Sequence, residues 1–244
     1  MSNKPANQKR VQNEIEHFSK MDHVWWGAKT KSGQKRYDYK LEKLIEYCHP
    51  TIGVKILEIG CGDGEFTKRL TKLKCKITAT DVTPALIKRG RKVIKNKKIN
   101  FLVDNAEKMR FAKESFDLVC GISILHHIDY QKTLKETYRV LKKDGQLFFT
   151  EPNLVNPIIW AGLNVDYLRK RMEFSLDETA LMKRQMEKLL KKIGFKEYKV
   201  VNYDFIHPSI PFYLTEKAEK VSKILEQFPL LKELSGSLII WARK

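Results

Sequence analysis

The sequence predicts an α/β protein in which helices cover a mainly parallel sheet. The clearest unit is the stretch from Val54 to Asp81. Its first apolar run stops at Gly60, a glycine-rich turn and a helical pattern follow, and a second strand places Asp81 at its carboxyl end. The order strand, turn, helix, strand and acid is typical of a nucleotide-binding βαβ unit.

The glycine turn differs from a dinucleotide-binding turn. A dinucleotide fingerprint needs its third glycine where Glu65 stands, and this chain has Gly60, Gly62 and Gly64 instead. An acid, Glu58, also lies in the end of the first strand. This arrangement resembles the first motif, E/D-x-G-x-G-x-G, of the class I S-adenosylmethionine-dependent methyltransferases. The resemblance implies that the turn faces S-adenosylmethionine and that S-adenosylhomocysteine is the product.

Two strand ends extend the predicted cofactor site. Asp81 is placed to accept hydrogen bonds from ribose hydroxyls. The strand at 99–103 ends in Asp104, Asn105 and Ala106, which resemble the family's adenine corner. There Asp104 would accept from the exocyclic amine and Ala106 would leave room for the ring. The predicted cofactor-binding residues are Tyr37, Glu58, Gly60, Cys61, Gly62, Asp81, Val82, Asp104, Asn105, Ala106 and Cys120.

The segment after the fourth strand contains the candidate general bases. The strand at 116–120 is followed by GISILHHI at 121–128, which resembles the family's fourth motif, D-x-V…L-x-H-V/I. Nucleic-acid amino methyltransferases typically carry Asn/Asp-Pro-Pro-Tyr/Phe here, so the segment argues against base N-methylation. His126 and His127 follow the strand beside the expected methyl position. Either one is a candidate base, and the alternative is a histidine that only packs or bonds to backbone.

The other elements follow from periodicity and capping. We expect helices at 11–20, 36–48, 66–73, 84–94 with Thr83 as N-cap, 130–141 and 176–193. Further strands are expected at 76–80, 146–150, 194–203 and 237–243. The family resemblance implies a Rossmann-like seven-stranded sheet in the order 3-2-1-4-5-7-6, with the last strand antiparallel, flanked by helices.

Two segments exceed what this fold needs, at about 153–176 and 207–236. We expect both to form helical or loop inserts that cap the acceptor, although extra core or a dimer surface is the alternative for the second. Residues 1–35 are predicted to be an N-terminal arm or lid, and 36–244 the methyltransferase domain. The arm resembles the start of ubiquinone-type O-methyltransferases over a few residues. The candidate acceptor contacts are Trp25, Trp26, Asn153, Trp160, Tyr167 and His207.

Composition limits the partners. The chain has 47 basic and 29 acidic residues, a net charge of +18, which suggests an acidic partner unless it reflects lysine-rich composition throughout. No run is long enough to span a membrane, and no signal peptide is recognisable. The cysteines have neither paired nor metal-type spacing, so we expect reduced thiols, no metal and a cytoplasmic protein; they are Cys48, Cys61, Cys75 and Cys120.

The favoured function is methyl transfer from S-adenosylmethionine to a hydroxyl, amine or carbon of a small-molecule acceptor, a class that includes lipophilic molecules. An RNA or protein methyltransferase that uses the basic surface is one alternative, and a non-catalytic S-adenosylmethionine-binding regulator is another. Nucleic acid is a less favoured partner, and a peripheral contact with an anionic membrane also stays open. The sequence is compatible with a monomer or a homodimer.

Overall fold

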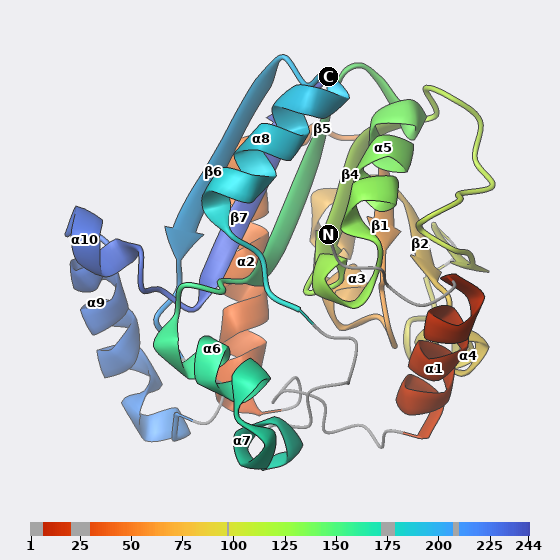
Figure 1. The fold of residues 1–244 in the computed structure, drawn as a ribbon. Coiled ribbons are helices and arrows are strands. Elements are labelled where there is room, and N and C mark those ends of the chain that lie inside the picture. The colour runs from red at the N-terminus through yellow and green to blue at the C-terminus, as the bar shows by residue number, and fades with distance from the viewer. Residues whose placement is uncertain (1–6, 21–29, 97, 172–178, 207–209) are drawn as a thin grey trace.

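A computed structural model of the chain describes residues 7–20, 30–96, 98–171, 179–206 and 210–244 (Figure 1). These residues form one seven-stranded sheet in the order β3-β2-β1-β4-β5-β7-β6, which confirms the predicted topology. Neighbouring strands are parallel except at β7, which is antiparallel to both β5 and β6. The strands are β1 (Lys55–Ile59), β2 (Lys76–Asp81), β3 (Ile99–Val103), β4 (Phe116–Ile122), β5 (Leu141–Pro152), β6 (Glu197–Tyr203) and β7 (Ser237–Arg243).

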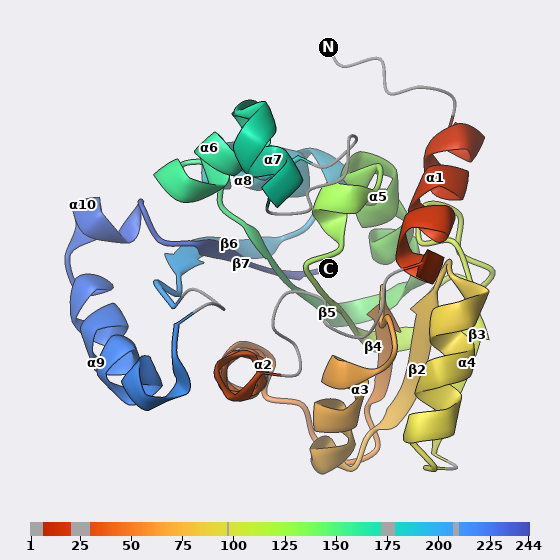
Figure 2. The same cartoon turned by 90° about the horizontal axis from the view of Figure 1, so that it is seen from below.

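Helices cover both faces of the sheet (Figure 2). One face carries α2 (Lys31–Cys48), α3 (Glu65–Leu70) and α4 (Pro84–Val93), and the other carries α5 (Tyr130–Val140) and α8 (Lys183–Ile193). Further helices lie at the end where the parallel strands have their carboxyl ends (Figure 1); they are α1 (Asn7–Lys20), α6 (Pro157–Asn164), α7 (Asp166–Arg171), α9 (Thr215–Leu225) and α10 (Pro229–Lys232). Short 3₁₀ turns occupy Thr71–Leu73, Leu125–His127 and Phe212–Leu214.

The core lies on both sides of the central strands. Leu57 of β1 packs in the cluster that includes Leu134 of α5, whereas the preceding residue, Ile56, packs in the cluster that includes Leu44 of α2. Successive residues of a strand point to opposite faces, and both faces of this sheet are covered. This explains why β1 is a nearly continuous apolar run rather than an alternating one.

Several helix boundaries differ from the prediction. Helix α2 begins at Lys31, five residues before the predicted start, because the Thr30 side chain accepts a hydrogen bond from the Gly33 N–H. Helix α8 begins at Lys183 rather than 176, since Leu181 forms a parallel bridge with Asn153. Helix α4 begins at Pro84 with Thr83 as its N-cap residue, as predicted, but the Thr83 side chain makes no capping hydrogen bond.

Strand β5 is longer than predicted. It begins at Leu141, which pairs with Phe116, whereas the strand was expected at 146–150. A register shift follows between Phe116 and Leu118, and Asp144 has a φ of 62°. The strand is therefore irregular before its expected start at residue 146.

The four cysteines are buried and unpaired with one another. Within the described ranges, no helix combines the length and the apolarity needed to cross a bilayer.

Candidate functional site

The glycine turn after β1 requires glycine for two separate reasons. Gly60, Gly62 and Gly64 have φ values of +66°, +55° and +95°, in the left-handed region that side chains disfavour. A Cβ on Gly60 would also lie 2.5 Å from Cγ1 of Ile124. By contrast, a Cβ on Gly62 would meet nothing within 4 Å. The turn thus packs tightly on one side and leaves its backbone open on the other.

Asp81 fixes this turn to the end of β2. Its Oδ2 accepts a hydrogen bond from the Gly62 N–H at 3.0 Å, and its Oδ1 accepts one from the Thr83 N–H at 2.9 Å. Burial raises the pKa of Asp81, and these two hydrogen bonds oppose that rise. A carboxylate has about four lone-pair sites, so two hydrogen bonds leave it able to accept more from a ligand.

One cleft joins the ends of β1, β2 and β3. It is lined in part by the predicted residues Gly60, Asp81, Val82, Asp104, Asn105 and Ala106. The Asp104 carboxylate also pairs with Arg110, with 3.1 Å between Oδ1 and Nε. Parallel strands present their carboxyl ends at one edge, which is why residues so far apart in sequence meet here.

Five predicted cofactor residues lie outside the lining of this cleft: Gly62 and four residues with side chains. Glu58 is buried and accepts a hydrogen bond from Thr67 Oγ1 at 2.6 Å; burial raises its pKa to about 8. Tyr37 packs against Phe66, with 6.5 Å between ring centroids. The other two, Cys61 and Cys120, are buried thiols whose pKa values burial raises well above the ordinary range. Glu58 thus supports the turn from within the protein, whereas contacts of these four side chains with a ligand stay predictions.

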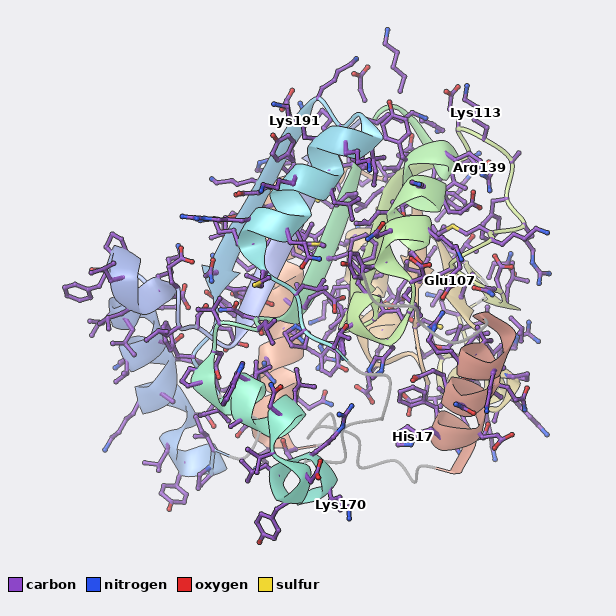
Figure 3. All side chains as sticks on the ribbon, in the orientation of Figure 1. His17, Glu107, Lys113, Arg139, Lys170 and Lys191 are labelled. Carbon is purple, nitrogen blue, oxygen red and sulfur yellow. The ribbon has the colours of Figure 1, made fainter. Side chains whose placement is uncertain are left out.

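Helix α1 closes one side of the same cleft, which sequence reasoning missed. Its residues Arg10, Val11, Glu14 and Phe18 are among those that line the cleft. Arg10 is only 1% exposed, forms an ion pair with Glu107 and donates a hydrogen bond to the His127 carbonyl. Figure 3 shows Glu107 close to α1. The spacing of 10, 11, 14 and 18 along one helix face was the available signal, but nothing in it identified the partner.

The two candidate histidines have different surroundings. His126 Nδ1 lies 2.7 Å from Oε2 of Glu151, at the end of β5. Glu151 also accepts hydrogen bonds from the backbone N–H groups of Ile124 and Leu125. His127 lines the cleft instead, with its Nδ1 3.4 Å from Glu14 Oε2. Both rings are buried. The His126 ring is held by a carboxylate, whereas the His127 ring faces α1.

Lys40 is a second residue that sequence reasoning missed. It belongs to α2, is 7% exposed, and its Nζ lies 5.3 Å from the centroid of the Tyr37 ring. Burial lowers the pKa of Lys40 to about 7; the positive charge of Arg36 lowers it further, whereas Asp204 and Glu151 oppose the shift. A nearby anion would stabilise the charged form of a lysine in this setting. In the sequence it is one of many lysines on an amphipathic helix, without a distinguishing motif.

The predicted acceptor contacts are dispersed. Asn153 is fully buried, and its Nδ2 donates to the carbonyls of Glu233 and Ser235. Trp160 on α6 and Tyr167 on α7 are 55% and 69% exposed. These roles stay predictions. Three other predicted contacts, Trp25, Trp26 and His207, lie outside the described residues.

Known proteins resemble this chain in sequence. Residues 57–149 match the model of a methyltransferase domain. A ubiquinone biosynthesis O-methyltransferase of Nitrosococcus oceani is 29% identical over 149 residues, which cover 58% of this chain and 62% of that protein. A demethylmenaquinone methyltransferase of Chlorobaculum parvum is 26% identical over 210 residues, covering 85% and 73%. The match thus spans less than two thirds of the first relative's length.

Solved structures share the fold. A chain in the complex between the Haloferax volcanii Trm112 methyltransferase activator and a putative methyltransferase superposes with a TM-score of 0.65. It is 16% identical, and the match covers 89% of this chain and 95% of that one. A putative methyltransferase from Bacillus halodurans gives a TM-score of 0.60 at 24% identity, with coverage of 84% and 98%.

Proposed function

The chain belongs to the class I S-adenosylmethionine-dependent methyltransferases, and on that premise we propose that it methylates a hydroxyl group of a small quinone-type or hydroxyaromatic acceptor. One observation carries the proposal: the cleft that joins Gly60, Asp81 and Ala106 lies on the carboxyl edge of the sheet, where the His126–Glu151 pair also lies. The names of the two sequence relatives support a quinone-type acceptor.

The proposed cofactor residues suit S-adenosylmethionine, which supplies an activated methyl group when bound. Asp81 would accept hydrogen bonds from the ribose hydroxyls with its remaining lone pairs. Asp104 and Asn105 would face the adenine, with Ala106 leaving room for the ring. Gly62 supports the assignment, because the space beside its Cα is open. Glu58 would hold the turn through Thr67 rather than touch the ligand.

Lys40 is proposed to pair with the carboxylate of the cofactor's methionine part. The lysine is buried in α2, where the negative charge of Glu151, at the end of β5, acts on it. A buried ammonium beside Arg36 is destabilised, and an anionic group would restore its preference for the charged form. Cofactor binding and protonation of Lys40 would then be coupled.

His126 is proposed to accept the proton of the acceptor hydroxyl. If Nδ1–H donates to Glu151, the ring is held in the tautomer whose Nε2 is basic. The Glu151 carboxylate would also stabilise the imidazolium that forms. Positioning the acceptor in line with the methyl group and excluding water supply the rest of the rate enhancement. The role of His127 would be to shape the cleft together with α1.

The N-terminal segment is proposed to act as a cover for this cleft, and residues 36–244 as the methyltransferase domain. Helix α1 contributes to the cleft lining, and the Arg10–Glu107 ion pair attaches it to the segment after β3. Because Arg10 also donates to the His127 carbonyl, α1 connects the proposed adenine corner to the histidine segment.

The test is a turnover assay with S-adenosylmethionine and a panel of hydroxylated aromatic and quinone compounds, read out as S-adenosylhomocysteine and as methylated product by mass spectrometry. His126→Gln should lower kcat by about 10²-fold or more, the usual contribution of a general base, and should flatten the pH–rate profile. Cofactor affinity should change little.

His49→Asn is the matched control. His49 is exposed and caps the carboxyl end of α2, away from the cleft. Failure of every acceptor, with cofactor binding intact, would reject the acceptor class. An unchanged kcat in the folded His126→Gln variant would reject the base assignment.

A further inference from the structure

Large apolar side chains are exposed on the two inserts. On the second insert, Phe228 and Leu230 are 53% and 86% exposed, and Val221 and Ile224 of α9 are more than half exposed as well. On the first insert, Trp160 and Ile158 are 55% and 57% exposed. Exposed apolar residues that occur singly need no explanation, but a group at one end of a molecule indicates a binding surface.

The two inserts are joined by hydrogen bonds at the carboxyl end of the sheet. Asn156 caps α6 by accepting from the Ile158 N–H at 3.0 Å, and its Nδ2 donates to the Leu234 carbonyl at 2.7 Å. The side chain of Asn153 also donates hydrogen bonds to this stretch, to the carbonyls of Glu233 and Ser235. The start of α6 and the segment after α10 are therefore joined, and both lie at the carboxyl end of the sheet (Figure 1). We call the exposed side chains of α6 and α7, together with those of residues 213–234, the docking face.

Basic residues are interleaved with these apolar ones. Lys217 and Lys220 lie four residues before Val221 and Ile224, so the helical repeat places them on the same stripe of α9. Lys170 of α7 lies at the same end of the molecule (Figure 3). A helix with an apolar stripe and lysines beside it is typical of segments that lie in a membrane interface.

The acidic residues of α9 are engaged on its other side. Lys35 of α2 lies 3.6 Å from Glu216 and 3.8 Å from Glu219. Glu226, just after the helix, accepts a hydrogen bond from the Asp204 N–H. The local charge of the docking face is therefore positive, in keeping with the net charge of +18 for the whole chain.

We propose that the docking face binds the surface of an anionic phospholipid bilayer. The apolar side chains of α6, α9 and α10 would enter the headgroup region, while the lysines would contact lipid phosphates. The aromatic residues Trp160, Tyr167 and Tyr213 suit the boundary between headgroups and acyl chains. A second copy of the chain is a poorer occupant, because a symmetric pair would bring the lysines of two identical faces together. Binding of the docking face to a membrane would not depend on methyl transfer.

The experiment is co-sedimentation of the full-length chain with vesicles. One set contains only phosphatidylcholine, and the other contains phosphatidylcholine mixed with phosphatidylglycerol. We expect binding to the anionic vesicles that weakens as salt is raised, and little binding to the neutral ones. Absence of binding to anionic vesicles at low salt would overturn the proposal.

Matched variants locate the surface. Phe228→Glu combined with Leu230→Glu should reduce binding at least about tenfold, since two apolar anchors are lost. Ile52→Glu is the control, because Ile52 is 77% exposed in the loop before β1, at the other end of the sheet. Lys170→Glu should reduce binding about fivefold or more, whereas Lys191→Glu, at the far end in Figure 3, should not.

Circular dichroism establishes that each variant is folded, and the single Leu230→Glu change carries the test if the double variant is not. Equal binding by the docking-face variants and the controls would overturn the proposal. So would a lipid-independent dimer in sedimentation velocity that Phe228→Glu dissociates, because the occupant would then be a second copy.

Discussion

The proposed cofactor cleft and the proposed docking face lie at the same end of the sheet, yet they are built in opposite ways. In the cleft, polar side chains have specific partners: the half-buried Asp81 accepts from two backbone N–H groups, and the buried Arg10 pairs with Glu107. On the docking face, apolar side chains such as Leu230 are exposed. The first arrangement fixes atoms in place. The second becomes more favourable in free energy only when another surface covers its apolar side chains.

This difference separates the effects expected from mutations. Changes in the cleft should alter cofactor binding strongly, because buried partners lose their geometry. Changes on the docking face should leave the fold and the cofactor site nearly untouched.

The largest effect is expected at the glycine turn. Gly60→Val would place a branched side chain at a φ of +66° and drive its Cβ into Ile124. We expect a loss of roughly 2 kcal/mol or more in the free energy of unfolding, and no measurable binding of S-adenosylmethionine by calorimetry.

Gly53→Val is the control for backbone strain alone. Gly53 has a φ of +87°, but a Cβ there would meet nothing within 4 Å. The control should lose stability and keep its cofactor affinity. Native affinity in Gly60→Val would contradict the assignment of this turn.

The next effect concerns Asp81. Asp81→Ala should weaken S-adenosylmethionine binding by about 1.5–3 kcal/mol, the range for hydrogen bonds to a charged group, in a protein that still folds. Asp117→Ala is the matched control. Asp117 also accepts a backbone N–H, from Lys55, but it lies at the amino end of β1 and β4. Equal affinity losses in the two variants, measured by titration calorimetry, would remove Asp81 from the ribose site.

A smaller effect depends on pH. The pKa of Lys40 is lowered to about 7, and an anionic ligand would raise it. The complex would then hold more protons than the free protein above that pH, so affinity should fall as pH rises through 7 and be nearly constant below it. The slope can reach about tenfold per pH unit.

Titration calorimetry of S-adenosylmethionine from pH 6 to 9 measures this slope. Lys40→Met should bind more weakly and lose this contribution to the slope, and Lys40→Arg should restore affinity without it. A slope that persists unchanged in Lys40→Met would have to come from another group, including the ligand's own amine.

The smallest effect is expected on the docking face. Leu230→Ser should change the free energy of unfolding by no more than about 0.5 kcal/mol, because the side chain is 86% exposed. Leu134→Ala, in the fully buried core, should cost about 2–5 kcal/mol. Urea denaturation compares the two variants. A large loss in Leu230→Ser would mean that the face is part of the folded core.

Sequence alone determined the sheet and much of the cleft. Apolar runs, glycine spacing and strand-end acids are local patterns, and parallel strands necessarily bring their carboxyl ends to one edge. The turn at Gly60 and the meeting of Asp81 with Ala106 at one edge were therefore predictable, whereas the strand order followed from the family resemblance. The helix boundaries were less predictable from the sequence. A cap such as that of Thr30, or a bridge such as that of Leu181, depends on a few specific hydrogen bonds.

Only the tertiary structure decided which distant residues became partners and which apolar residues stayed outside. Arg10 and Glu107 are 97 positions apart, and His126 and Glu151 are 25 apart. No periodicity encodes such pairs, since they arise from how complete elements pack. The inserts show the same limit: their aromatic and aliphatic content favoured a closed cap, yet Trp160 and Leu230 are exposed. Composition specifies how much apolar surface a segment carries, whereas the direction in which it faces is set by its anchoring bonds, here those of Asn153 and Asn156.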